Sequence, residues 1–206
     1  MTTLLHVSAS PRGERSESLA LARTFLEEFR DTHPDVRVEE WDLWDGTLPA
    51  FGPDAVAAKM DVFAGRQPAG RGWADAVAAF RRFDAADAYL FSVPMWNHGV
   101  PYVVKQFIDV VSQPGLVFGF DPATGYTGLL TGKRAAVLYT SAVYGDGRDR
   151  AFGTDFQAPY FNDWLRWAGV ADVSTVEFRP NLVTADAEGA RRLAHEQARD
   201  LAKRFG

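Results

Sequence analysis

Hydroxyl and guanidinium side chains gather near the N-terminus, directly before a pattern typical of an amphipathic helix. The segment reads Ser8-Ala9-Ser10-Pro11-Arg12-Gly13-Glu14-Arg15-Ser16-Glu17-Ser18. Because the amide N–H groups and positive dipole of a helix N-terminus favour anions, we expect this segment to bind a phosphate. Helix capping alone would account for Ser16 but not for Ser10 and Ser18. The segment lacks both G-x-x-x-x-G-K-[ST] and G-x-G-x-x-G, which argues against a nucleoside triphosphate site or a standard dinucleotide site.

A second segment combines a thioether, an indole, an amide and an imidazole. It reads Pro94-Met95-Trp96-Asn97-His98-Gly99-Val100-Pro101. Apolar walls with amide groups at their edge suit a flat heteroaromatic ligand, although Met95 and Trp96 would also fit as ordinary packing at a rim. His98 is either a general base or has no chemical role. A third segment mixes small polar residues with an aromatic one: Thr140-Ser141-Ala142-Val143-Tyr144-Gly145-Asp146-Gly147.

Each of these segments follows a run of residues typical of a buried strand. The apolar runs, which suit strands covered on both faces of a parallel sheet, are 4–7, 88–93 and 135–139. Two further runs alternate with polar residues, as edge strands can: 36–39 and 174–178. Helical spacing of apolar residues is found in 19–29, 103–111, 156–168 and 190–205.

This succession predicts an α/β fold in one domain over residues 1–206. Its core would be a doubly wound parallel sheet of five strands in the order 2-1-3-4-5, with helices on both faces. Ligands bind beyond the carboxyl ends of the strands in such sheets, so the three segments are expected to form one site.

The stretch 42–72 resists this scheme. It contains too many glycine and proline residues for one helix, and only Val56, Met60 and Phe63 suggest an amphipathic turn or two. A long irregular connection inside a compact domain is often functional, so we expect it to take part in dimer contacts or in the rim of the site.

Composition narrows the classes of function. The 206 residues carry a net charge of −5, with basic residues scattered rather than clustered, which argues against nucleic-acid and membrane partners. The absence of cysteine removes thiolate metal sites and cysteine nucleophiles, and no metal site is expected. Neither a signal peptide nor an apolar run of about 18 residues is present, so we expect a cytoplasmic protein.

Several short motifs together match one known family. They are Ser10 with Ser16-Glu17-Ser18, Leu48-Pro49-Ala50-Phe51, Ala57-Ala58-Lys59, Ala64-Gly65, Pro94-Met95-Trp96-Asn97, Lys105-Gln106-Phe107-Ile108-Asp109, Gly115-Leu116-Val117-Phe118 and Thr131-Gly132-Lys133. With them, the chain resembles the flavodoxin-like family of FMN-dependent NADH-azoreductases and NAD(P)H:quinone oxidoreductases over nearly its whole length.

The resemblance implies bound FMN, NADH or NADPH as co-substrate, and a quinone or azo compound as acceptor. Flavin N5 would carry the hydride in two steps, so no catalytic side chain is expected. The FMN phosphate would be held by Ser10, Ser16, Glu17 and Ser18, with Glu17 acting chiefly through its backbone. The isoalloxazine would be lined by Met95, Trp96, Asn97 and His98 and met at its far edge by Thr140, Ser141, Ala142 and Val143.

The resemblance also implies a homodimer with the site at its interface, and it places Phe120 and Trp167 over the exposed face of the flavin. The chain departs from the family in one place: relatives often carry Ser-Arg-Gly-Gly where this chain has Ser141 followed by the bulkier Ala142-Val143-Tyr144.

Two other functions suit the same fold. A flavodoxin-type electron carrier would bind FMN but pass single electrons to proteins, usually from a strongly acidic face. A flavin-free phosphodiesterase-like hydrolase would need a nucleophile elbow or a metal cluster, and the sequence shows neither.

Overall fold

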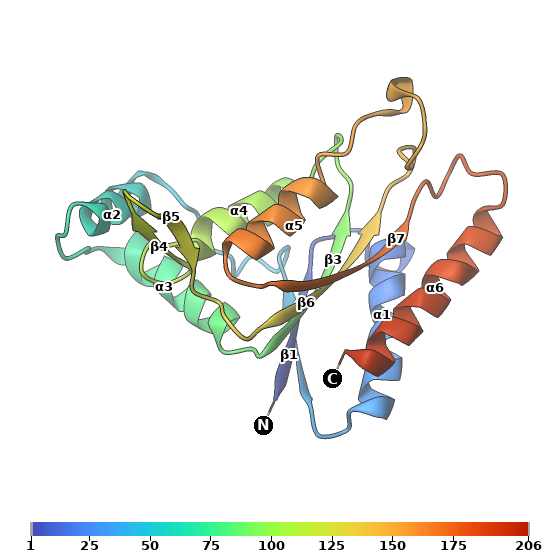
Figure 1. Cartoon of the computed structure of the whole chain (residues 1–206), viewed down its shortest axis with the longest axis horizontal. Coiled ribbons are helices and arrows are strands. Elements are labelled where there is room, and N and C mark those ends of the chain that lie inside the picture. Colours follow the sequence, from blue (N-terminus) through green and yellow to red (C-terminus); the bar gives the residue numbers. More distant parts are fainter. Residues whose placement is uncertain (1, 206) are drawn as a thin grey trace.

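A parallel sheet of five strands forms the centre of the computed structural model, which describes residues 2–205 (Figure 1). In spatial order the strands are β2 (Arg37–Asp42), β1 (Thr3–Ser8), β3 (Ala88–Pro94), β6 (Arg134–Thr140) and β7 (Asp172–Phe178). This is the predicted order 2-1-3-4-5, so the predicted fold class is confirmed. Because every pair is parallel, all five carboxyl ends meet at one edge of the sheet.

Helices cover both faces of this sheet (Figure 1). Helices α1 (Glu17–Thr32) and α6 (Ala187–Arg204) lie together on one side, and the other side carries α2 (Pro53–Phe63), α3 (Arg71–Asp84), α4 (Tyr102–Val111) and α5 (Ala158–Trp167). Two short 3-10 helices, η1 (Gly13–Arg15) and η2 (Arg150–Phe152), interrupt loops. None of the helices in residues 2–205 has an apolar stretch long enough to cross a membrane.

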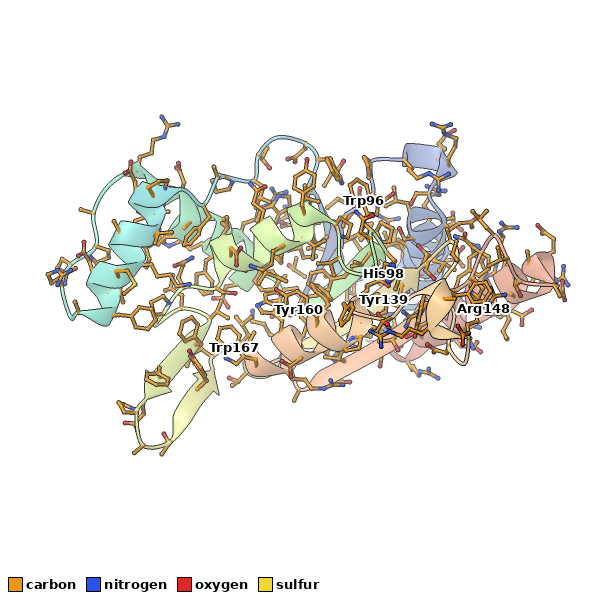
Figure 2. All side chains as sticks on the ribbon, turned by 90° about the horizontal axis from the view of Figure 1, so that it is seen from above. Trp96, His98, Tyr139, Arg148, Tyr160 and Trp167 are labelled. Carbon is orange, nitrogen blue, oxygen red and sulfur yellow. The ribbon has the colours of Figure 1, made fainter. Side chains whose placement is uncertain are left out.

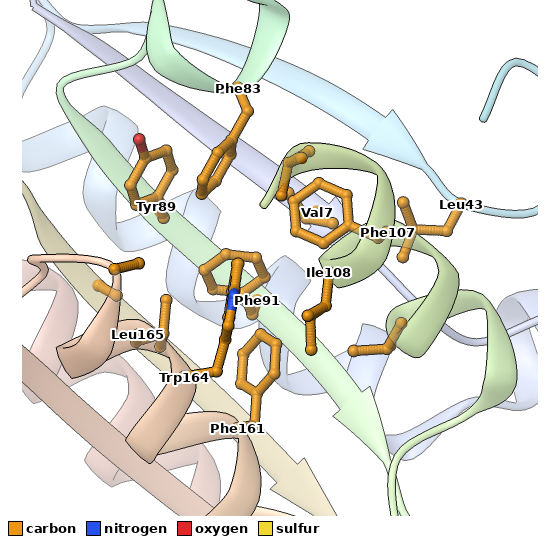
Figure 3. Packing of buried hydrophobic residues seen from close by; sticks show 14 of the residues in the cluster. Val7, Leu43, Phe83, Tyr89, Phe91, Phe107, Ile108, Phe161, Trp164 and Leu165 are labelled. Carbon is orange, nitrogen blue, oxygen red and sulfur yellow. The ribbon is translucent and has the colours of Figure 1, made fainter. Parts of the chain in front are cut away.

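The alternation of side chains along the strands divides the core into two clusters. Leu4 and Leu90 pack with α1 and α6, whereas their neighbours Leu5 and Phe91 pack with the helices of the other face. Figure 3 shows this second cluster, which is rich in aromatic rings: Phe83 stacks on Tyr89 at 4.2 Å between ring centroids.

Helix α5 buries only part of the apolar stripe that the helical spacing of Phe156, Tyr160, Trp164 and Ala168 predicts. Trp164 lies in the core as expected, and its Nε1–H donates to Ser112 Oγ at 3.0 Å. Phe156 and Tyr160, however, are exposed, and the buried positions are instead Ala158, Phe161, Trp164 and Leu165. The expectation of a stripe through 156 and 160 was wrong because the helix starts only at Ala158, which leaves Phe156 in the preceding loop.

The stretch 42–72 is more regular than predicted. Helix α2 runs for 11 residues, with Gly52 as its N-cap and Pro53 at its first position, and Gly65 follows its end with a φ of 69°. The glycine and proline residues therefore mark the ends of a helix rather than preventing one. Its large apolar residues Val56, Met60 and Phe63 remain exposed.

Residues 118–128 form a hairpin, although no strand was predicted in this part of the sequence. Its strands are β4 (Phe118–Asp121) and β5 (Gly125–Gly128), and they pair with each other outside the main sheet. The hairpin touches the chain after α5 through two glycines: a Cβ on Gly128 would lie 2.3 Å from the amide nitrogen of Gly169. The backbones can therefore pack this closely only where both residues lack a side chain.

Candidate functional site

The three chemistry-bearing segments meet at the carboxyl edge of the sheet, as predicted. The amide of Ala9 donates to the Ser92 carbonyl at 3.1 Å, and that of Met95 donates to the Thr140 carbonyl at 2.7 Å. The chain after β7 joins them, since the amide of Asn181 donates to the Ser141 carbonyl at 2.9 Å. Backbone hydrogen bonds thus hold the loops after β1, β3, β6 and β7 side by side, in the same order as the strands that they follow.

Three buried hydroxyl groups, which we call the hydroxyl cluster, lie in the loop after β1 and in the first turn of α1. Ser10, Ser16 and Ser18 are all buried. Ser16 caps the helix by accepting from the Leu19 amide at 3.3 Å, and its Oγ also lies 3.1 Å from Ser18 Oγ. The first amide N–H groups of a helix have no intrahelical acceptor. Free hydrogen-bond donors and the positive end of the α1 dipole therefore lie next to these hydroxyl groups. Capping and anion binding are therefore compatible functions of this cluster.

The carboxylate of Glu17 turns toward α6. Glu17 accepts from Arg191 Nη2 at 2.7 Å and from its Nε at 3.2 Å. This hydrogen bonding raises the pKa of the Arg191 guanidinium further above its usual value. The pair neutralises a negative charge next to the hydroxyl cluster and leaves the Glu17 amide at the helix terminus. Sequence reasoning missed Arg191 because the two residues are 174 positions apart.

The segment after β3 forms a tight hairpin with a strained backbone. Trp96 and Gly99 exchange two backbone hydrogen bonds of 2.9 Å, and the two residues between them have positive φ values, 47° for Asn97 and 71° for His98. Positive φ at both central positions is the pattern of a type I′ turn, and such conformations in residues other than glycine cluster at functional sites. The turn presents the Asn97 and His98 side chains at the tip of the hairpin.

This hairpin and the segment after β6 enclose a pocket of about 240 Å³. Its lining is Met95, Asn97, His98, Ser141, Ala142, Val143, Tyr144 and Phe152. Trp96 does not line it but packs against Trp44 at 5.7 Å between ring centroids, and Thr140 is buried at the end of β6. In the view of Figure 2, both Trp96 and His98 lie near the middle of the molecule.

A buried arginine supports the loops around this pocket. Arg179 donates to Asp155 at 2.8 Å and to Glu177 at 2.7 Å, and its guanidinium lies 5.4 Å from the centroid of the Tyr144 ring. The other oxygen of Asp155 accepts amides at the start of α5. Burial, followed by the hydrogen bond to Asp146, raises the pKa of Tyr144 to about 12. Arg179 therefore connects the end of β7, the start of α5 and the segment after β6.

Phe120 and Trp167, which were predicted to lie over the flavin, do not line this pocket. Helix α5 starts beside the pocket, and its ten residues carry Trp167 about 14 Å along the axis, away from His98 (Figure 2). There the Trp167 ring contacts Phe118 at 4.7 Å and Tyr126 at 5.6 Å between centroids, and Phe120 is exposed on the hairpin. A second pocket of about 540 Å³ is lined by residues that include Lys59, Phe118, Tyr126, Trp164 and Trp167.

Comparison with known proteins places this geometry in a family. Residues 2–202 match the model of a flavodoxin-like fold family. The chain is 42% identical to an FMN-dependent NADH:quinone oxidoreductase of Ruegeria pomeroyi, covering 91% of this chain and 94% of the relative. It is 40% identical to one of Bradyrhizobium diazoefficiens, with both chains fully covered. An azoreductase structure from Bacillus anthracis superposes with a TM-score of 0.89 at 26% identity, also over both whole chains. The chain therefore belongs to the flavodoxin-like family of FMN-dependent NADH:quinone oxidoreductases and azoreductases.

Proposed function

We propose that this protein binds FMN and uses NADH or NADPH to reduce quinones or azo compounds. The observation that carries the proposal is the pairing of two sites along one sheet edge. The hydroxyl cluster of Ser10, Ser16 and Ser18 suits a phosphate, and the pocket behind Asn97 and His98 suits a flat ring. FMN consists of those two parts, and the names of the relatives agree with it.

The residues of the chain would bind and orient the cofactor. When bound, FMN supplies hydride chemistry at N5, first with the nicotinamide and then, after it leaves, with the acceptor. Ser10, Ser16, Ser18 and the amides at the start of α1 would hold the phosphate. The hairpin that contains Asn97 and His98 would fix the edge of the ring system, because its backbone is locked by paired hydrogen bonds. The bulky side chains of Val143 and Tyr144 would narrow the space at the opposite edge of the ring system.

The test is spectroscopic. Purified protein should be yellow, and its visible absorption should bleach with NADH in the absence of oxygen and return when a quinone is added. A colourless protein that binds no added FMN would favour the hydrolase. A stable one-electron form during stepwise reduction would favour the electron carrier, and either result would contradict the proposed function.

We further propose a homodimer with the site at its interface. In one chain Phe120 and Trp167 lie at the far end of α5 from the flavin pocket, so their predicted place over the flavin requires a second copy. The end of the molecule that carries them also exposes Phe63, Met60 and Tyr126. Monomers seldom leave such apolar surface uncovered. Light scattering at micromolar concentration should give twice the 22.7 kDa mass of the chain, and a monomeric mass would contradict the dimer.

Trp167→Ala should then change acceptor selectivity. Aromatic pairs contribute about 0.5–1.5 kcal/mol beyond the area that they bury, so KM for a naphthoquinone should rise by about twofold to tenfold. A small non-aromatic acceptor such as ferricyanide serves as control and should be affected much less. Flavin content should stay nearly unchanged, whereas the melting temperature should fall somewhat because Trp167 packs on Phe118 and Tyr126. Unaltered selectivity, with only the melting temperature lowered, would show that Trp167 serves the packing beside Phe118 and does not contact the acceptor.

A further inference from the structure

The imidazole of His98 is held from one side by the loop that leads into α5. The amide of Thr154 donates to His98 Nδ1 at 3.1 Å, and the amide of Phe156 donates to the His98 carbonyl at 2.9 Å. Gly153 lies flat against the ring: a Cβ at this position would be 2.9 Å from Nδ1 and 2.8 Å from Cε1. The exposed histidine is therefore fixed both at its backbone and at one nitrogen.

These contacts choose between the two neutral forms of the ring. A backbone N–H can only donate, so Nδ1 must accept and carries no proton in the neutral imidazole. The proton then resides on Nε2, at the other side of Cε1. Among residues 2–205, Nε2 has no hydrogen-bond partner, and the side chain lines the pocket beside Asn97 and Ser141.

We propose that His98 is a hydrogen-bond donor to the ring system of bound flavin, with its Nε2–H tautomer set by Thr154. The proposal rests on the proposed function, since it needs FMN in this pocket. The isoalloxazine edge carries carbonyl oxygens and unprotonated ring nitrogens, all of which accept hydrogen bonds. Thr154 acts through His98 and is a positioning residue, and Gly153 lets its loop approach the ring.

Nitrogen NMR of the flavin-free protein tests the tautomer directly. With histidine labelled with ¹⁵N, the His98 signals, identified by their loss in His98→Phe, should show the Nε2–H form when the ring is neutral. Thr154→Pro removes the donating amide and should give a mixture of tautomers, whereas the matched control Thr154→Ala keeps the amide and should keep the Nε2–H form. An Nδ1–H form in the unaltered chain, or the same spectrum in a folded Thr154→Pro variant, would overturn this role of Thr154.

Titration of the same flavin-free protein with FMN tests the donor. His98→Phe keeps a flat ring but has no N–H, and it should weaken FMN binding about threefold to tenfold. His98→Gln places an amide N–H in the same region and should restore most of the affinity. Equal affinities for the unaltered chain and His98→Phe, or equal losses in the Phe and Gln variants, would overturn the donor role alone. Failure of the unaltered chain to bind FMN would overturn the proposed function itself, and with it the donor role.

Discussion

Replacing Ser16 and Ser18 together by alanine is expected to weaken FMN binding by tens-fold or more while the chain keeps its fold. Both hydroxyls are buried at the N-terminus of α1, 3.1 Å apart, where a phosphate would meet them. A hydrogen bond to a charged group contributes about 1.5–3 kcal/mol, and the double variant removes two. Fluorescence titration of the flavin-free protein with FMN measures the change.

Two measurements separate this loss from damage to the helix. Removal of the Ser16 cap should itself lower the free energy of unfolding by about 0.5–2 kcal/mol, which circular dichroism during denaturation would detect. Ser174→Ala, on edge strand β7, is a matched control and should bind FMN as the unaltered chain does. Unchanged FMN affinity in the double variant would show that the cluster only caps α1.

Arg179→Met should lower the free energy of unfolding by about 3–5 kcal/mol. Its guanidinium is buried between Asp155 and Glu177, and removing one partner of such a group leaves carboxylates without compensation. For a chain of this length, the melting temperature should fall by roughly 6–20 °C. The shape of the pocket beside His98 should also change, because Arg179 lies over the ring of Tyr144, which lines that pocket.

A second variant makes the interpretation specific. Arg192→Met changes an exposed arginine on α6 and should alter the free energy of unfolding by no more than about 0.5 kcal/mol. If Arg179→Met changed the free energy of unfolding as little as Arg192→Met, the contacts of Arg179 would not stabilise the fold. Chemical denaturation of both variants, with and without FMN, distinguishes a loss of fold from a loss of pocket shape.

Much of the fold follows from local pattern. Continuous apolar runs and alternating runs predict which strands lie in the centre and which lie at the edge. The doubly wound order 2-1-3-4-5 fits that assignment, and it is the order observed. The same pattern locates the three segments at the carboxyl edge. The β4–β5 hairpin was not predicted because its strands are only four residues long and lie outside the main sheet.

The missing parts of the site depend on long-range contacts. Nothing near Glu17 in the sequence indicates Arg191, and nothing near Asp155 indicates Arg179, because the sheet brings each pair together only after folding. The turn at 97–98 is different. Asn is common at positive φ, and its place before His98 and Gly99 is a signal from which a type I′ turn could have been predicted.

The contact between Gly128 and Gly169 has a consequence for how the protein can diversify. It is the joint that fixes the β4–β5 hairpin, with Phe120, to the end of α5, with Trp167. A side chain at either glycine would push the two apart and shift both aromatic residues together. Gly169 comes just before β7, at the amino edge of the sheet, whereas the loops with Ser16 and with Asn97 and His98 follow strands at the carboxyl edge. A mutation at the glycine contact would therefore move Phe120 and Trp167, the proposed acceptor-binding residues, and leave the cofactor-binding loops in place. Evolution could thus change the acceptor specificity at this contact without changing the residues that would bind the cofactor.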